Sequence, residues 1–150
     1  MKIQTAHFGE IDYDMDQAFR FEKGLPGLEE DTAFALLAVD DTQPVFWLQS
    51  LVRPQISLPV VNPLLLCPTY SFEIPDADTE LLHLEDVQDV CILSVLVIPS
   101  GQPDGMTVNL AAPVILNMKN RQGRQILLDD RRYSTKTPVS ELLRELEAKR

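Results

Sequence analysis

The sequence predicts an all-β domain, and three observations support this prediction. Short runs rich in Val, Ile, Leu, Phe and Tyr recur along the chain, and Pro, Gly, Asp and Asn separate them. The 150 residues include 11 prolines, and this length matches one domain. A sheet of so many short strands must also pair or cover the free backbone N–H and C=O groups of its edge strands. We therefore expect a small closed or nearly closed antiparallel β-barrel, with a β-sandwich as the alternative.

The expected strands follow one another along most of the chain. The first two form a hairpin across residues 7–9. A second hairpin is expected at residues 119–123, a polar connection that ends in glycine, which tolerates a positive φ. The predicted strands are residues 3–6, 10–13, 18–22, 33–39, 45–51, 56–61, 70–74, 90–98, 106–110, 114–118 and 125–128.

Two segments depart from the β pattern and are predicted to be helices. Residues 74–84 offer aspartate caps, an acidic first turn and then apolar residues, which indicates a short helix with an acidic exposed face. The second helix begins at Thr137, as cap, and Pro138, as first helical residue. It is amphipathic, and its apolar stripe either packs on the barrel or docks a partner. The stripe comprises Val139, Leu142, Leu143 and Leu146.

Charge is distributed unevenly along the chain. Residues 1–118 hold 18 acidic and four basic side chains, whereas residues 119–150 hold five acidic and nine basic ones. No Lys or Arg occurs from Pro54 to Met118. A surface of one dominant sign attracts partners of the opposite sign and repels nucleic acid and anionic lipid. The alternative is that these carboxylates only keep the protein in solution.

No catalytic or metal-binding motif is apparent. The pattern D-x-D-x-D at residues 12–16 resembles a calcium loop, but Gln17 replaces the required glycine and Lys23 the bidentate glutamate. The two histidines, His7 and His83, lack the spacing of zinc ligands. Neither a nucleophile elbow nor a phosphate-binding glycine loop occurs. We therefore expect no metal and no cofactor, while a Ser-His-Asp arrangement or a carboxylate pair assembled only in space stays open.

Cysteine usage and hydropathy point to the cytoplasm. Cys67 and Cys91 lie in apolar runs, where reduced thiols behave as small hydrophobes. The N-terminus has no apolar stretch of signal-peptide length, and no window reaches the roughly 18 apolar residues of a membrane helix. We expect a cytoplasmic protein that binds neither membranes nor, directly, nucleic acid.

In several short strings the residue types look as if they are required at those positions. The strings follow one another along the chain. They are KIQT at residues 2–5, HFG at 7–9, FEKGLPGL at 21–28, FWLQS at 46–50, YSFEIP at 70–75, MTVNLAAPVILN at 106–117 and GRQ at 123–125. Taken together, these strings resemble the flagellar assembly factor FliW family, from residue 2 to about residue 135. We accordingly expect a FliW-like barrel domain at residues 1–135. Residues 136–150 would form a helical extension outside the family's common core.

The resemblance implies a non-enzymatic protein that binds two partners in alternation. One is unsecreted flagellin, and the other is the translational regulator CsrA. Flagellin that accumulates in the cell occupies the factor. After flagellin is exported, the freed factor binds CsrA and relieves repression of flagellin messenger RNA. Because CsrA binds RNA, it must carry cationic surface, and the acidic layout of this chain suits such a partner.

Candidate contact residues follow from the charge pattern together with this resemblance. A carboxylate rim for the regulator is expected, and a loop bracketed by two glycines is expected to present Leu25 outward. For the remaining residues the alternative is that they only satisfy backbone geometry. The rim comprises Glu73, Asp76, Asp78, Glu80 and Asp104, and the residues that shape contacts are Leu25, Pro26 and Asn109.

One function of a different class remains open from the sequence. A β-barrel can hold a small molecule in its interior, either to bind it or to hydrolyse it. The alternative is therefore a small-molecule-binding or hydrolytic β-barrel.

Overall fold

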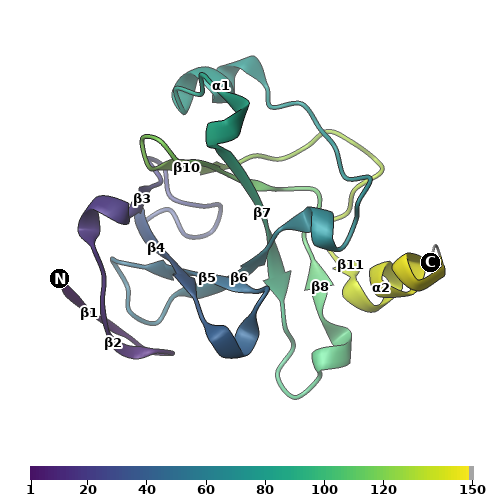
Figure 1. The fold of residues 1–150 in the computed structure, drawn as a ribbon, viewed down its shortest axis with the longest axis horizontal. Coiled ribbons are helices and arrows are strands. Elements are labelled where there is room, and N and C mark those ends of the chain that lie inside the picture. Colours follow the sequence, from purple (N-terminus) through teal and green to yellow (C-terminus); the bar gives the residue numbers. More distant parts are fainter. Residues whose placement is uncertain (149–150) are drawn as a thin grey trace.

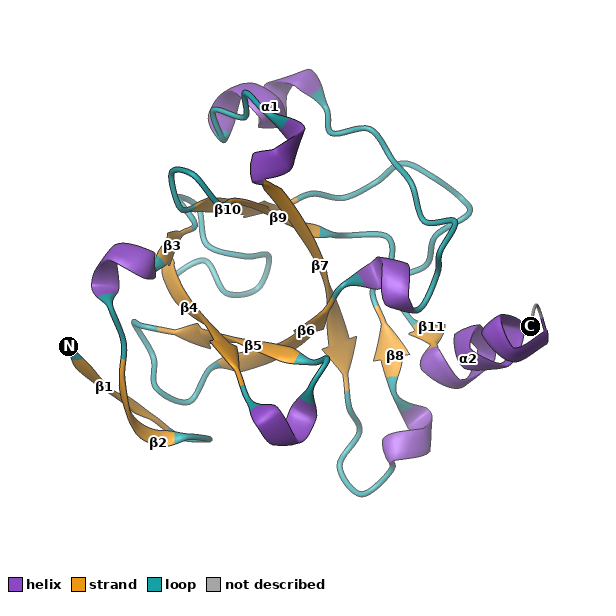
Figure 2. Ribbon diagram, in the orientation of Figure 1, coloured by secondary structure: helices purple, strands orange, loops and turns teal. Residues whose placement is uncertain are grey.

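Seven strands close into a barrel in this computed structural model, which describes residues 1–148. Figures 1 and 2 look roughly down the ring of strands. Their order around it is β7-β6-β5-β4-β3-β10-β9, and β9 pairs back to β7. The prediction of a closed barrel is confirmed. The strands are β3 (Phe19–Arg20), β4 (Ala33–Ala38), β5 (Phe46–Ser50), β6 (Ser57–Val61), β7 (Val90–Val97), β9 (Val114–Asn117) and β10 (Gln122–Gln125).

One contact of the barrel is parallel rather than antiparallel. Gln122 of β10 pairs in parallel with Arg20 of β3, whereas the other ring neighbours are antiparallel. These two strands are about a hundred residues apart in the sequence and meet only where the barrel closes. No hairpin therefore imposes an antiparallel direction on them.

Four shorter strands lie outside the ring. The hairpin of β1 (Lys2–Thr5) and β2 (Gly9–Asp12) is a separate two-stranded sheet beside the barrel, as its sequence predicts. β8 (Thr107–Val108) pairs with the last part of β7, and β11 (Thr137–Pro138) pairs with β8. β7 therefore leaves the barrel wall at its C-terminal end and continues into a second small sheet.

Two α-helices are present. α1 (Asp76–Leu81) lies above one end of β7, as the acidic segment predicts, but Pro75 precedes it and no aspartate side chain caps it. α2 (Val139–Ala148) begins later than expected, because Thr137 and Pro138 pair with β8 as a strand. The last two residues of the predicted extension lie outside the described part. No helix among residues 1–148 has the length and apolarity to cross a membrane.

α2 packs one side of its apolar stripe on the barrel. Leu142 is buried in a cluster with Val108 and Leu96, and Val139 packs against the same cluster. Leu143, on the adjoining side of the stripe, stays exposed. Of the two roles that the sequence leaves open for this stripe, Leu142 therefore takes the first, which is packing on the barrel.

The predicted strand at residues 70–74 is wrong. This segment has no regular structure, yet its aromatic residues are anchored by their side chains. The hydroxyl of Tyr70 donates to the carbonyl oxygen of Leu110 at 2.7 Å, and its ring lies 4.6 Å from that of Tyr133. Side-chain packing, rather than a strand ladder, thus accounts for its apolar alternation.

The second hairpin is displaced from its expected position. β10 covers Gln122–Gln125 rather than residues 125–128, and the positive φ of 62° falls on Arg121 rather than on glycine. Gly123 lies within the strand, where a Cβ atom would come 2.5 Å from Cζ of Phe21. The glycine is therefore required for close packing on Phe21, and not for a turn.

Side chains fill the inside of the barrel. Large residues from six of the seven barrel strands meet there, all but β10, and Leu25 enters from the loop before β4. The expectation that Leu25 points outward is wrong, because an isolated bridge between Leu25 and Leu28 folds this loop into the barrel. The interior cluster comprises Phe19, Phe21, Leu25, Phe34, Leu48, Val60, Leu93, Val114 and Leu116. The interior is therefore a packed core of side chains, as in other small barrels.

Both cysteines are free thiols, and both are half-buried rather than fully buried. Cys91 packs against the interior cluster, and burial raises the pKa of its thiol. The protonated form is therefore favoured at Cys91, as expected of a structural cysteine.

A buried ion pair joins the start of β4 to the end of β5. Asp31 has no exposed surface, and its carboxylate accepts from the hydroxyl of Ser50 at 2.6 Å and from the guanidinium of Arg53. Nε of Arg53 lies 3.1 Å from Oδ2 and 3.2 Å from Oδ1 of Asp31. Hydrogen bonding to Arg53, chiefly, lowers the pKa of Asp31, and the Ser50 bond adds to this. Sequence reasoning missed this pair, whose members lie 22 positions apart.

Candidate functional site

A cleft of about 880 Å³ lies between α1 and the barrel. Three segments line it: residues 20–29 after β3, residues 77–83 of α1 and its end, and β10. Figures 1 and 2 show α1 beside β10 at one edge of the molecule. The cleft brings together parts of the chain that are about a hundred residues apart.

Asparagine side chains fix the end of α1 to the barrel. Nδ2 of the buried Asn117 donates to the carbonyl oxygens of Leu82 at 2.8 Å and His83 at 3.3 Å. Asn120 donates to the same oxygen of Leu82 at 3.0 Å. Leu82 itself is buried against Ile115. The helix is therefore held at its C-terminal end by β9 and the turn that follows it.

Asp78 of α1 is paired with Arg124 of β10. Its Oδ1 atom lies 2.5 Å from Nε of Arg124, and only 13% of the Asp78 side chain is exposed. The expectation that Asp78 belongs to an open acidic rim is therefore wrong, since its charge is compensated and largely covered. Its place in the structure is to hold α1 against β10.

The cleft carries both signs of charge. Three basic and three acidic side chains line it, together with the amides of Gln122 and Gln125. The charged residues are Arg20, Lys23, Arg124, Glu22, Glu29 and Glu80. Such a balanced lining does not select a small anion or cation, and mixed polar groups of this kind suit the surface of another protein. The basic residues of this lining were missed in the sequence, although the string GRQ contains Arg124.

The expected rim residues fall into two separate places. Glu73, Asp76 and Glu80 are exposed on or beside α1, and Pro26 lines the same cleft as Glu80. Asp104 lies in the 3-10 turn Pro103–Gly105 between β7 and β8, at the opposite edge of the molecule from α1 (Figure 1). The expectation of one rim that includes Asp104 is therefore wrong, because β7 separates the two places.

Asn109 organises backbone at the end of β8. Its Oδ1 atom accepts from the backbone N–H groups of Ala111 at 3.1 Å and Ala112 at 3.0 Å. Its own N–H donates to the carbonyl oxygen of Val95. The side chain of Asn109 thus satisfies nearby backbone groups, which is the alternative to partner contact that the sequence leaves open.

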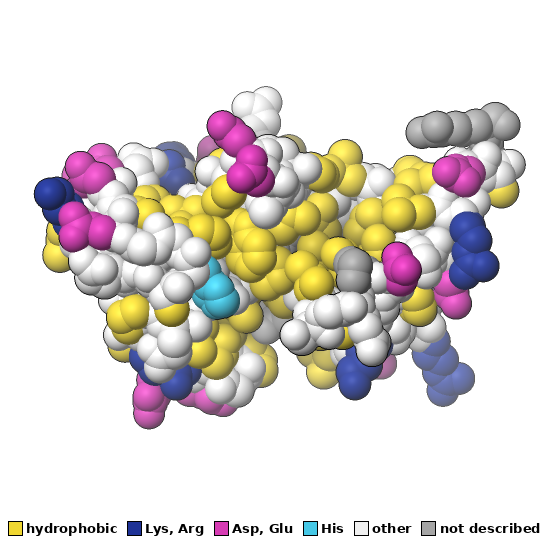
Figure 3. Space-filling view, turned by 90° about the horizontal axis from the view of Figure 1, so that it is seen from below, with side chains coloured by type: hydrophobic (Ala, Val, Ile, Leu, Met, Phe, Trp, Pro, Cys, Tyr) yellow, Lys and Arg dark blue, Asp and Glu magenta, His cyan; other side chains and the backbone are white. Residues whose placement is uncertain are grey.

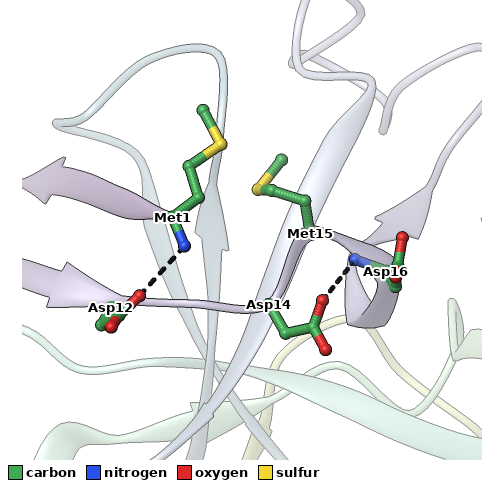
Figure 4. Close-up of a pocket in the computed structure, with 5 residues that line it drawn as sticks. All are labelled: Met1, Asp12, Asp14, Met15 and Asp16. Carbon is green, nitrogen blue, oxygen red and sulfur yellow. Dashed lines mark hydrogen bonds and ion pairs between the residues drawn. The ribbon is translucent and has the colours of Figure 1, made fainter.

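A second, open hollow lies beside the N-terminus (Figure 4). Asp12 pairs with the terminal ammonium group at 3.0 Å, and Asp14 accepts from the backbone N–H of Asp16 at 2.9 Å. The carboxylates serve separate local contacts and do not converge on one point (Figure 4). Among residues 1–148, no three His, Cys, Asp or Glu side chains are grouped to hold a metal ion.

Replacing Asn117 with alanine should release α1. The change removes the hydrogen bond to the carbonyl oxygen of His83 and one of the two to that of Leu82. A buried polar group left unpaired costs about 1–3 kcal/mol. Hydrogen exchange of residues 78–84 should accelerate, and the free energy of unfolding should fall by about 2 kcal/mol. Asn109→Ala is the matched control, since it breaks backbone contacts elsewhere. Equal acceleration in both variants would contradict the proposed anchoring of α1.

Comparison with known proteins gives a consistent result. The model of the FliW protein family matches residues 2–139. The flagellar assembly factor FliW of Thermosipho africanus is 40% identical over 141 residues, which are 94% of this chain and 97% of that protein. That of Caldanaerobacter subterraneus subsp. tengcongensis is 38% identical over 145 residues, 96% of each chain. A crystal structure of the flagellar assembly factor FliW superimposes with a TM-score of 0.86 at 32% identity, and the match covers 93% of this chain and 96% of the other.

Proposed function

This chain belongs to the FliW family of flagellar assembly factors, and we propose that it binds unsecreted flagellin and, in alternation, the translational regulator CsrA. Binding of CsrA would relieve repression of flagellin messenger RNA and so couple flagellin translation to export. The activity is one of binding, not catalysis, and it takes place in the cytoplasm, where flagellin awaits export. Family membership over residues 2–139 is the observation that carries this proposal.

The acidic face of α1 supports an electrostatic contact with CsrA. Glu73, Asp76 and Glu80 are exposed, and none of them pairs with a basic side chain in the described part of the chain. The Asp78–Arg124 pair holds the helix that presents them. An RNA-binding protein carries Lys and Arg for phosphate contacts, and these can meet the carboxylates instead. The proposed CsrA surface is therefore Glu73, Asp76 and Glu80, with Pro26 at the edge of the adjoining cleft.

Reversing two of these charges should slow the association with CsrA. In the double variant Glu73→Lys and Glu80→Lys, we expect an association rate roughly tenfold lower at low salt and a flatter salt dependence. Stopped-flow mixing at two ionic strengths measures both quantities. Asp104→Lys is the matched control, because this carboxylate follows the far end of β7, whose eight residues span roughly 23 Å, and the Debye length at physiological salt is only about 8 Å. An unchanged rate in the double variant would remove this surface from the proposal.

Size-exclusion co-elution tests the function as a whole. The purified protein is mixed with flagellin and with CsrA from the same organism, first separately and then together, at low and moderate salt. We expect binding to each partner, displacement in the mixture and a salt-sensitive CsrA complex. Binding to neither partner would refute the proposed function.

A further inference from the structure

Apolar side chains gather on the underside of the molecule, away from α1 (Figure 3). Three of them follow one another across neighbouring strands, because Leu37 pairs with Trp47 and Trp47 with Pro59. Phe8, from the β1–β2 hairpin, lies edge-on to Trp47 with ring centroids 5.5 Å apart. All four side chains remain partly exposed. This row lies on the outer wall of the barrel and is not part of its interior cluster.

The exposed end of β7 adjoins this row. Pairing between β6 and β7 ends at Val60 and Val95, next to Pro59, which has no N–H with which to continue the ladder. β7 then pairs with β8 and ends at Val97, and Ile98 follows the strand directly; the two side chains are 56% and 42% exposed. We call Phe8, Leu37, Trp47, Pro59, Val97 and Ile98 together the underside patch. Exposed apolar residues that adjoin one another in this way mark interaction sites.

Hydrogen bonds hold the aromatic part of the underside patch in place. The indole N–H of Trp47 donates to Oγ1 of Thr42 at 3.0 Å. The backbone N–H of Phe8 donates to Oγ1 of Thr5 at 2.9 Å, which fixes the hairpin turn. Rings that are ordered before binding lose little conformational entropy when a partner arrives. The patch is therefore prepared for contact.

Exposed carboxylates lie in two turns that are near residues of the underside patch in the chain. Asp40 and Asp41 belong to the 3-10 turn Asp40–Thr42, directly beside the residue that holds Trp47. Asp104 lies in the turn that follows β7. All three are exposed, and none forms an ion pair within residues 1–148. A complementary partner therefore presents apolar side chains flanked by Lys or Arg.

We propose that the underside patch binds an apolar segment of unassembled flagellin that carries Lys or Arg beside its apolar side chains. A filament subunit exposes, before it assembles, the apolar surface that it later buries against its neighbours, since permanent interfaces are the more hydrophobic ones. Aromatic anchors with a polar rim are the usual composition of such a contact. The inference rests on the proposed function, and it assigns flagellin to a face other than that of the α1 carboxylates.

Two single variants test the underside patch. In Val97→Asp and Ile98→Asp we expect flagellin to bind roughly tenfold more weakly or worse by calorimetry, with CsrA binding unchanged. Val87→Asp is the matched control, since Val87 is 84% exposed in the turn before β7, at the strand's other end. Trp47 is the sole tryptophan of the chain, so its emission, after subtraction of the signal of flagellin alone, should shift during titration. Thermal unfolding confirms that each variant is folded.

The outcomes separate the inference from the proposed function. If the wild-type protein binds flagellin and both patch variants bind it equally well, the inference is overturned while the function stands. If the wild-type protein binds no flagellin, the proposed function and the inference fail together. If Val97→Asp changes the elution volume of the protein in the absence of flagellin, a second copy of the chain covers the patch. This outcome also overturns the inference.

Discussion

Replacing Asp31 with alanine should lower the free energy of unfolding by about 3 kcal/mol. Asp31 is fully buried, and its removal leaves the guanidinium of Arg53 and the hydroxyl of Ser50 without their acceptor. A buried charge that loses its partner is among the most destabilising of single changes. The pair also joins the start of β4 to the end of β5, so its loss should weaken the wall of the barrel.

Denaturant unfolding of Asp31→Ala and of a surface control measures this effect. Asp130 forms a similar forked contact with Arg132, and their closest atoms lie 2.8 Å apart, but water reaches this pair. Exposed ion pairs contribute little because they are solvated and screened. Asp130→Ala should therefore change stability far less than Asp31→Ala. Equal losses in the two variants would show that burial does not distinguish these pairs.

The buried pair of Asp31 and Arg53 also predicts how the stability of the protein depends on pH. The pKa of Asp31 lies below its usual value of 3.8 in the folded protein, so the unfolded chain binds a proton more readily. The stabilisation is therefore fully present above pH 3.8 and is lost as the pH falls through the lower folded pKa. Asp31→Asn should remove this part of the acid sensitivity. A profile that falls as steeply below pH 4 in the variant would contradict the assignment.

Gly24→Ala is the second change with a large expected effect, a loss of about 3 kcal/mol of unfolding free energy. Gly24 has a φ of +65°, and an added Cβ would lie 2.5 Å from the backbone oxygen of Leu28 and 2.7 Å from Cα of Glu29. Relief requires movement of the loop backbone, and the same loop places Leu25 in the barrel interior. The substitution should therefore disturb both the interior and the cleft lining.

A second glycine in the same loop separates backbone strain from collision. Gly27 has a φ of +82°, but nothing lies within 4 Å of an added Cβ. Gly27→Ala should lose only about 1 kcal/mol, the cost of a left-handed conformation. Thermal and denaturant unfolding of the two variants give the comparison. Similar losses would mean that the close approach of Gly24 to Leu28 and Glu29 has little weight.

The sequence predicts local structure well where one segment determines it. Alternating apolar runs predict β4 to β7, and the acidic segment before His83 predicts α1. Long-range partners are not encoded locally. Asp31 with Arg53 and Asp78 with Arg124 meet only after the barrel closes, so neither pair has a spacing that could reveal it. For the same reason the isolated sequence of residues 21–28 gives no sign that Leu25 is an interior residue.

The candidate site likewise combines features that one segment determines with features that depend on distant segments. The carboxylates of α1 could be identified from charge alone, whereas grouping them with Asp104 required knowledge of where the β7–β8 loop lies. Asn117 and Gly123 stand in the strings that resemble the family, and the structure supplies their physical roles. One anchors α1 and the other admits Phe21. A positional residue can thus be noticed in a sequence before its role can be explained.

The length of β7 bears on how two partners could exclude one another. Its eight residues run from beneath α1 to the underside patch, and seven steps of extended chain span roughly 23 Å. A protein contact of ordinary size covers about 800 Å² on each side, a disc with a radius of about 16 Å. Two such footprints centred on the ends of β7 would overlap at their margins. Flagellin and CsrA could thus compete by bulk alone, without a residue that both of them need.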